Sequence, residues 1–230
     1  YEFILDYLNN EIVLKHTGDT TCQPVKSYQL KIKNPLPFRF PFADCIIDEM
    51  IEAEVMIDTG SPFSLVLPLS MIEKQDYSGK RKLIKATGNI AKWPFTSSEK
   101  NYLARLRSFE MGGVRFANIP VLYAELPQNA SFLIMGKDLL SKFTLTINYP
   151  KSEMILTPNG TGPINQNLYS TGLALTKEAT SNAVVKGYWD GSPASKSILE
   201  IGDEVLRINS IPTSRLSLRE INIILSDDVV

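Results

Sequence analysis

Apolar and polar residues alternate along much of the first 160 positions, a pattern typical of β-strands. The alternation is clearest over residues 51–57, and segments 118–123 and 143–147 are rich in β-branched and aromatic residues. Gly112 and Gly113 mark a turn between two such segments. This part of the chain is therefore predicted to be mainly β.

Helical patterns are scarce. A short turn of helix is predicted over residues 137–141, and the clearest helical spacing covers residues 216–225. Residues 158–167 are rich in Pro, Gly and Asn, which is typical of a linker. The chain is therefore predicted to hold one domain over residues 28–160 and a second over 169–230.

An internal similarity links residues 1–18 to residues 143–160, an offset of 142 positions. Both segments have the apolar alternation and polar turn of a β-hairpin, and four residues are identical at matching positions. Tyr7, Glu11, Leu14 and Gly18 recur as Tyr149, Glu153, Leu156 and Gly160. The match favours a duplication, in which residues 1–18 are the tail of an upstream lobe. The alternative is that two unrelated hairpins look alike.

Composition narrows the classes of function. The 230 residues are 43% hydrophobic with a net charge of −1, which fits one or two globular domains and gives no sign of nucleic acid or an acidic membrane as main partner. The single histidine, His16, rules out a zinc site with two histidines. Cys22 and Cys45 are either one disulfide or two buried thiols. No apolar run is long enough for a transmembrane helix.

The sharpest local signal is an Asp-Thr-Gly-Ser motif. An apolar strand ends at Ile57 and is followed by Asp58, Thr59, Gly60 and Ser61. Gly60 permits a tight turn, and the two hydroxyl groups can hydrogen-bond a carboxylate. Such a turn would hold one carboxylate at the end of a sheet. The simpler interpretation is a turn that only joins two strands.

A second motif favours the catalytic interpretation. Ile134, Met135 and Gly136 end an apolar run after the Asp-Thr-Gly motif. Together the two motifs resemble the pepsin and retropepsin class of aspartic proteases, in which Asp-Thr-Gly is the catalytic loop and a hydrophobic-hydrophobic-Gly segment lies beside it. Residues 28–160 look like one such β-barrel lobe, closest to retropepsin-like lobes of bacterial aspartyl proteases. The resemblance implies no metal and no cofactor.

Hydrolysis by this class needs two carboxylates that share a proton around a water molecule, and the shared-proton dyad is a standard example of split pKa values. This lobe supplies one, Asp58. Asp138 is expected to cap a helix instead. The second carboxylate could come from an upstream lobe, about 85 residues before Tyr1 by the repeat. The runner-up source is a homodimer.

The resemblance also implies a β-hairpin flap over the substrate. By position the flap would lie within residues 83–103. Thr87 and Gly88 are expected near its start, and Trp93 and Phe95 are expected to line the cleft. The alternative is that Trp93 and Phe95 are ordinary core residues.

The C-terminal part resembles a PDZ domain, because residues 201–209 read Ile-Gly-Asp-Glu-Val-Leu-Arg-Ile-Asn before a helix. The resemblance implies a β-sandwich-like domain with a helix, which binds a peptide C-terminus as an added strand. The residues expected at that peptide site are Gly172, Leu173, Ala174, Leu175 and Leu218. The usual final strand is missing after Val230, so this domain is expected to be incomplete.

The sequence therefore predicts an aspartic endopeptidase that cuts protein substrates, with a PDZ domain that binds a substrate or partner peptide. The competing hypothesis is a non-catalytic peptide-binding PDZ protein with a protease-like scaffold lobe. Resemblance to bacterial enzymes leads us to expect a periplasmic, cell-envelope or secreted location. The protein substrate, the cleavage specificity and the pH optimum do not follow from the sequence.

Overall fold

The computed structural model describes residues 1–16, 26–34, 40–72, 82–90, 100–126, 130–160 and 171–226. The chain divides into two compact units. The first comprises residues 1–77, 105–123 and 129–166, and the second comprises residues 78–104, 124–128 and 167–230. The boundary cuts two long strands, β8 (Tyr102–Met111) and, at its last residue, β9 (Val114–Ala124), and each unit is described by itself. The predicted domain limits at 28–160 and 169–230 stay predictions.

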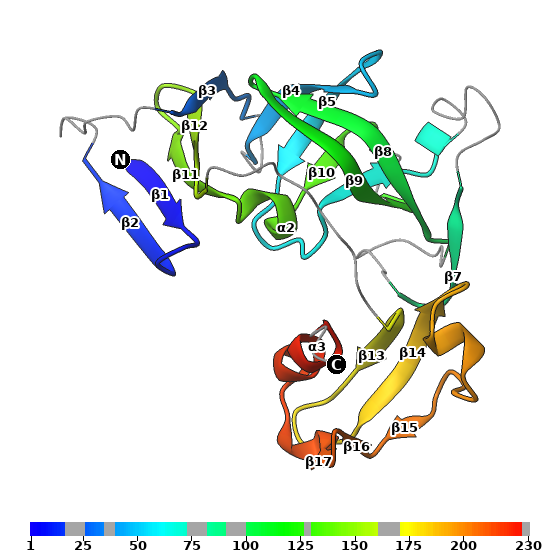
Figure 1. The fold of residues 1–230 in the computed structure, drawn as a ribbon. Helices are drawn as coiled ribbons and strands as arrows, with labels where there is room; N and C mark the ends of the chain where they lie inside the picture. The colour runs from blue at the N-terminus through cyan, green and yellow to red at the C-terminus, as the bar shows by residue number, and fades with distance from the viewer. Residues whose placement is uncertain are drawn as a thin grey trace. The chain divides into compact units, whose positions relative to one another are not determined.

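The first unit contains a β-barrel (Figure 1). Its strands follow the order β8, β4, β5, β10, β6 and β9, and β9 pairs back with β8. Their bounds are Phe42–Ile47 (β4), Ile51–Ile57 (β5), Leu65–Pro68 (β6), Tyr102–Met111 (β8), Val114–Ala124 (β9) and Leu133–Met135 (β10). The mainly β prediction is confirmed, as are the predicted strands at residues 51–57 and 118–123.

Alternation explains how these strands fill the barrel. In β4 and β8 buried residues alternate with more exposed ones, which places every second side chain in the core. Aromatic rings contact one another there: the centroid of Phe116 lies 5.7 Å from that of Phe109 and 6.0 Å from that of Phe143. The core holds β5 and β10 in place, and both strands lead into the candidate site.

A separate five-stranded antiparallel sheet completes the first unit, in the order β2, β1, β11, β12 and β3 (Figure 1). Its strands are Glu2–Asp6 (β1), Glu11–Lys15 (β2), Tyr28–Lys31 (β3), Phe143–Asn148 (β11) and Glu153–Pro158 (β12). Both hairpins expected from the internal similarity are confirmed. They lie side by side, because β1 pairs with β11.

The second unit is a smaller sheet with one helix. Its central strand, β14, pairs with β13 on one side and with β7 and β15 on the other. The strands are Ile84–Gly88 (β7), Leu173–Thr176 (β13), Ala183–Trp189 (β14), Glu204–Val205 (β15), Arg207–Ile208 (β16) and Ile211–Pro212 (β17). Short 3-10 helices cover Ala194–Lys196 (η2) and Thr213–Arg215 (η3). A PDZ fold stays a prediction.

Helix α3 (Leu218–Ser226) packs against the sheet of the second unit. Its Ile221 forms a buried hydrophobic cluster with Leu175, Ala183 and Val185. The helix predicted at residues 216–225 is confirmed, although it begins at Leu218. Ser217 is the N-cap of α3. Its Oγ accepts a hydrogen bond from the Glu220 N–H at 3.2 Å, and its own N–H donates to the Glu220 carboxylate at 2.7 Å. This reciprocal pair is a capping box.

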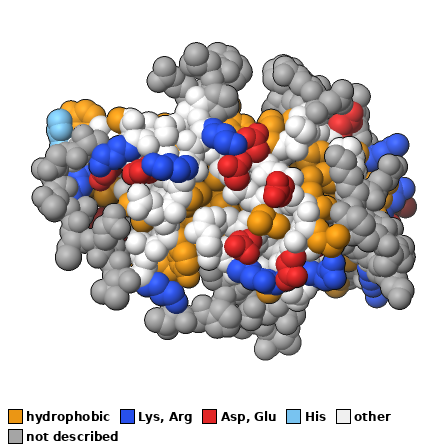
Figure 2. Space-filling model, turned by 90° about the horizontal axis from the view of Figure 1, so that it is seen from above, with side chains coloured by type: hydrophobic (Ala, Val, Ile, Leu, Met, Phe, Trp, Pro, Cys, Tyr) orange, Lys and Arg blue, Asp and Glu red, His pale blue; other side chains and the backbone are white. Residues whose placement is uncertain are grey.

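Basic and acidic side chains are interspersed on the face drawn in Figure 2. Close ion pairs among the described residues include Lys31 with Glu153 at 2.6 Å and Lys33 with Asp44 at 2.7 Å. Within the described ranges, no helix is both long and apolar enough to cross a membrane.

Candidate active site

Asp58 lies directly after β5, where the barrel strand gives way to a turn. The Gly60 N–H donates to Asp58 Oδ1 at 2.9 Å, and the Ser61 N–H donates to the Asp58 carbonyl at 3.2 Å. Thr59 and Gly60 are exposed, whereas Asp58 is half-buried. The turn therefore presents one carboxylate, oriented by its own backbone, at the end of a buried strand.

Strand β10 lies beside this turn. It runs parallel to β5 and antiparallel to β6, so that Met135 is the register partner of Ile57. The Asp58 N–H donates to the Met135 carbonyl at 3.0 Å, and the Gly136 N–H donates to the Ser64 carbonyl at 3.0 Å. The structure thus brings together the two motifs that the sequence singled out, Asp58–Ser61 and Ile134–Gly136, through backbone hydrogen bonds.

Gly136 is required by space rather than by backbone conformation. A Cβ at this position would lie 2.1 Å from the Phe63 carbonyl oxygen and 2.6 Å from that of Ser61. Both are backbone atoms, so neither can rotate away. The absence of a side chain at Gly136 allows the Asp58 loop and the β10–α2 turn to approach each other closely.

The predicted capping role of Asp138 is wrong. Helix α2 (Lys137–Leu140) begins after Gly136, which is its N-cap and contributes no side-chain hydrogen bond. Asp138 lies in the first turn, where it suits the positive end of the helix. Its carboxylate accepts a hydrogen bond from Ser64 Oγ. Asp138 therefore ties α2 to the segment that follows the Asp58 loop.

The hydroxyl group of Ser61 is buried beside the Asp58 loop. Its side chain is only 4% exposed, and among the described residues Oγ has no hydrogen-bond partner. This oxygen lies close to Gly136, 2.9 Å from where a Cβ would be. The Ser61 hydroxyl is therefore a buried polar group at the contact between the Asp58 loop and Gly136.

The described residues contain no cluster of three His, Cys, Asp or Glu side chains that could hold a metal ion. The chemical groups that the structure places at the site are the Asp58 carboxylate and the backbone and hydroxyl groups around it. A carboxylate of this kind can accept a proton from water, but a single one cannot also donate a proton to the leaving group at the same moment.

Of the four residues expected at the flap and cleft, the structure describes two, Thr87 and Gly88. Thr87 and Gly88 lie in β7, where they pair with Tyr188 and Gly187 of β14. Thr87 Oγ1 also donates to the Asp190 carboxylate at 3.0 Å. Trp93 and Phe95 lie outside the described residues. The flap role stays a prediction for all four.

Of the residues expected at the peptide site, Leu173, Ala174 and Leu175 lie in β13. Gly172 precedes the strand with a φ of +74°, and the Leu173 N–H donates to Thr171 Oγ1 at 3.3 Å. Ala174 and Leu175 flank a β-bulge, and the Leu175 side chain is buried in the core. Leu218 is the first residue of α3. Among the described strands β13 pairs only with β14, so its second edge has no strand partner there.

Thr213, a fully buried residue of the second unit, was not predicted from the sequence. Its Oγ1 accepts from the Ala183 N–H at 3.2 Å and donates to the Val205 carbonyl. One hydroxyl thus joins two strands and η3. In the sequence Thr213 is a single threonine in a polar turn, and the local pattern does not distinguish a buried threonine from an exposed threonine.

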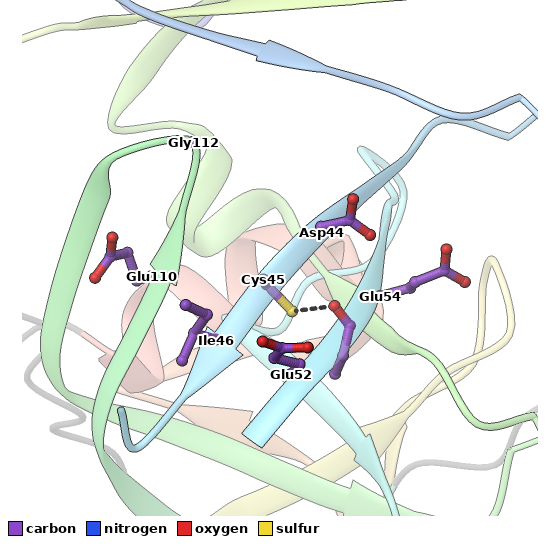
Figure 3. A pocket seen from close by; sticks show the side chains of 8 residues that line it. Asp44, Cys45, Ile46, Glu52, Glu54, Glu110 and Gly112 are labelled. Atoms are coloured by element: carbon purple, nitrogen blue, oxygen red, sulfur yellow. Dashed lines mark hydrogen bonds between the residues drawn. The ribbon is translucent and has the colours of Figure 1, made fainter. Parts of the chain in front are cut away.

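A hollow of about 550 Å³ lies over β4 and β5 and is rich in carboxylates (Figure 3). It is lined by Asp44, Cys45, Ile46, Glu52, Ala53, Glu54, Glu110 and Gly112. Lys33 bridges two of these carboxylates, at 2.7 Å from both Asp44 and Glu54, and these hydrogen bonds raise the pKa of Lys33. The hollow does not include Asp58.

Cys45 carries a free, buried thiol. Its Sγ donates to the Ala53 carbonyl at 3.3 Å, and burial raises the pKa of the thiol to about 12. Cys22 lies outside the described residues. Of the two alternatives left open by the sequence, the structure has Cys45 as a thiol rather than as half of a disulfide.

Comparisons with known proteins give structural likenesses only. No protein-family model and no curated protein sequence matches the chain. A retropepsin-like aspartic protease from Rickettsia conorii is 20% identical, with a TM-score of 0.41, over 57% of this chain and 91% of its own. Basic 7S globulin from soybean is 12% identical, with a TM-score of 0.38, over 68% of this chain and half of its own (50%). At these values neither likeness carries an argument about function.

Proposed function

We propose that the barrel unit is one lobe of an aspartic endopeptidase and that Asp58 is one of its two catalytic carboxylates. The observation that supports this most is the contact between the Asp58 turn and the Met135–Gly136 segment. The Asp58 N–H donates to the Met135 carbonyl at 3.0 Å, and the Lys137 N–H donates back to the Ser61 carbonyl at 2.7 Å. A turn that only joined two strands would not need such a neighbour, nor the close approach that Gly136 allows.

In this mechanism Asp58 and a second carboxylate hold one proton and one water molecule between them. The ionised group takes a proton from the water, which attacks the peptide carbonyl, and the protonated group donates its proton to the carbonyl oxygen. Two like charges a few Å apart repel each other, so the pair holds one proton between its two carboxyl groups. The Gly60 N–H, at 2.9 Å from Oδ1, orients the Asp58 carboxylate and stabilises its charge.

The second carboxylate is best supplied by another lobe of the same fold. A two-lobe chain tests this directly: a second copy of residues 28–142 is placed before Tyr1, which puts the two Asp58 residues 142 positions apart, the offset of the internal repeat. The two-lobe chain is expected to cleave an unfolded protein such as reduced casein. The 230-residue chain is expected to be inactive at micromolar concentration.

Asp58→Asn in the two-lobe chain is expected to lower the cleavage rate at least about 1,000-fold, because the amide cannot act as a base. Asp44→Asn is the matched control, since it removes an exposed carboxylate of the same barrel. A folded two-lobe chain that does not cleave, or one that still cleaves after Asp58→Asn, would rule out this function.

We also propose that the second unit binds a peptide as an added strand on the edge of β13, beside α3. The support is the edge of β13, which has no strand partner among the described residues, and the packing of α3 against that strand through Ile221 and Leu175. A peptide with a free C-terminal carboxylate should bind better than its C-terminal amide, and Leu218→Arg should weaken both. Equal binding of the two peptides would contradict the PDZ-like mode. Export to the periplasm or cell envelope stays an expectation.

A further inference from the structure

We infer that strand β7 is linked to the peptide site of the second unit, so that a peptide bound along β13 stabilises β7 and displacement of β7 weakens the peptide. This inference rests on the proposed peptide binding and deepens it, because it makes the second unit a regulatory domain and not only an anchor for a substrate. The residues involved, 84–90 and 171–194, all belong to the second unit.

Strand β14 lies between β13 and β7 and pairs with both through the same residues (Figure 1). Two of its residues have a register partner on each side, which gives two rows of three residues: Ala174, Gly187 and Gly88, and Leu173, Tyr188 and Thr87. Adjacent strands are about 4.8 Å apart, so β7 lies about 10 Å from the strand to which a peptide would be added. A change in β14 at these two rows affects both neighbours.

The end of β14 holds its two neighbours with consecutive residues. The Trp189 N–H donates to the Gly172 carbonyl at 2.9 Å, on the β13 side. The Asp190 N–H donates to the Lys85 carbonyl at 2.9 Å, on the β7 side. The Asp190 carboxylate also accepts a hydrogen bond from Thr87 Oγ1 at 3.0 Å. One short segment therefore fixes both β7 and the loop that precedes β13.

The loop before β13 also packs closely against the turn that follows β14. A Cβ on Gly172 would lie 2.2 Å from the Cβ of Ser192. The Ala194 N–H donates to the Thr171 carbonyl at 3.0 Å. The loop and the turn are thus in direct contact, so a peptide that orders the loop also orders the turn that holds β7.

The β-bulge in the β13–β14 ladder coincides with a contact to β7. The register shifts after Ala174, which leaves Lys186 of β14 without a register partner in β13. The Lys186 carbonyl instead accepts from the Asn89 N–H, directly after β7, at 2.9 Å. A Cβ on Gly88 would lie 2.4 Å from the same carbonyl oxygen. The irregular point of the peptide-binding ladder is therefore the point at which β7 approaches most closely.

Strand β7 has few other contacts that hold it. Of its five residues only Ala86 is buried. Its pairing with β8 covers Ile84 and Lys85, and the Ala86 N–H donates to the Asn101 carbonyl at 2.9 Å. Among the described strands, the last two residues of β7 pair with β14 alone. A strand held mainly by backbone hydrogen bonds opens readily, so its order should respond to changes in β14.

The linkage would extend towards the candidate active site through successive strand pairs. Strand β7 pairs with β8, whose residues 102–104 belong to the second unit and whose residues 105–111 belong to the first. In the first unit β8 pairs with β4, and β4 pairs with β5, the strand that precedes Asp58. A peptide that stabilises β7 would thus stabilise one end of this series of strands.

The first test compares amide hydrogen exchange in the 230-residue chain with and without a peptide. The probe is the tightest binder among acetylated heptapeptides that end in Ala, Val, Leu or Phe with a free carboxylate. At saturation it should slow exchange of the β7 amides and of the Asn89 amide at least about fivefold. The amides of β11, in the first unit, should not change. This test uses the wild-type chain, so it does not depend on whether a variant folds.

The second test uses the reciprocity of linkage. A peptide that slows the opening of β7 by some factor must lose affinity by the same factor when β7 is displaced. Gly88→Ala should displace β7 and weaken the peptide by that factor. Gly113→Ala is the matched control and should leave the affinity unchanged, because its φ is +80° against +81° at Gly88 and its nearest neighbouring atom lies at 3.8 Å.

Exchange in the variant reports on its folding. Protection of the Ala183 and Val185 amides, which donate to Thr213 and Asp203, shows that the second unit is folded. If β7 stays protected in Gly88→Ala, Thr87→Pro replaces it, because proline lacks the N–H of a paired strand residue.

The outcomes separate the linkage from the peptide binding on which it rests. A peptide that binds without slowing β7 exchange, or that binds equally well when β7 is displaced, overturns the linkage and leaves the peptide binding intact. If no heptapeptide of the set binds at up to about 1 mM, the proposed peptide binding fails and the linkage fails with it. Slower β7 exchange together with an equal loss of affinity is the expected result.

Discussion

Gly136 is the residue at which the geometry of the candidate site is most constrained. Gly136→Ala should lower the free energy of unfolding by about 1–3 kcal/mol, because its Cβ would lie 2.1 Å from the Phe63 carbonyl oxygen. Gly160→Ala is the control, since no atom lies within 4 Å of a Cβ there, and it should change stability by less than about 0.5 kcal/mol. Urea unfolding of both variants measures the difference. Equal effects would mean that the close approach at Gly136 is not a constraint.

Cys45 makes stability depend on alkaline pH. Burial raises the pKa of its thiol from 9.0 to about 12, so between these values the folded state retains a proton that the unfolded state has lost. Stability is therefore predicted to fall as pH rises from about 9 towards 12. The comparison of wild type with Cys45→Ala isolates the thiol from the tyrosines, which titrate in both proteins. A constant difference between the two across this range would contradict the prediction.

At the residue scale, the sequence predicted Asp58 and Gly136 because each belongs to a short local motif. It did not predict the hydrogen bond from Ser64 to Asp138, which joins residues 74 positions apart. A carboxylate near the start of a helix suggests a cap from local pattern alone. Only the packing of α2 against the Asp58 loop determines which partner it takes.

At the scale of elements, the cap of α3 gives a direct test. Ser217→Ala should destabilise the second unit by about 1 kcal/mol, because the Glu220 N–H loses its acceptor. Arg219→Ala, an exposed change inside the helix, should have little effect, since Ala has high helix propensity. Thermal unfolding followed by circular dichroism compares the two. A larger loss from Arg219→Ala would show that the capping box is not what stabilises α3.

Gly88 of β7 pairs with Gly187 of β14, and the two strands approach closely at these residues. A Cβ on Gly187 would lie 2.6 Å from the Thr87 carbonyl oxygen. Gly187→Ala should therefore separate these strands and increase amide exchange over Ile84–Gly88 by about tenfold or more. Hydrogen-exchange mass spectrometry measures this, with Gly160→Ala as control. Unchanged protection of β7 would show that the strand is held by other contacts.

The sequence predicted several strands and α3 through their apolar spacing, but not where β7 pairs. Residues 84–88 have no pattern that selects β14, which lies about 100 residues further along. The partner of a strand is set by register and by tertiary packing, and a local period of two residues contains neither. This is why the second unit includes residues 78–104, which the sequence had placed in the first domain.

At the scale of the whole molecule, the proposed mechanism needs two catalytic carboxylates, and each lobe supplies one, Asp58. The internal repeat was visible in the sequence, and the pairing of β1 with β11 places both hairpins in one sheet. The exposure of Ile12 and Leu14 could not be predicted, because their counterparts in β12 have the same apolar pattern and are buried.

The most direct measurement is the rate at which the two-lobe chain cleaves an unfolded protein with Asp58→Asn in the first lobe, in the second lobe, or in both. Two carboxylates that share one proton act as a unit, so each single change should remove as much activity as the double change. Matching residual rates in all three variants are the predicted result. A single variant that keeps about half of the activity would contradict the account, because each lobe would then work alone.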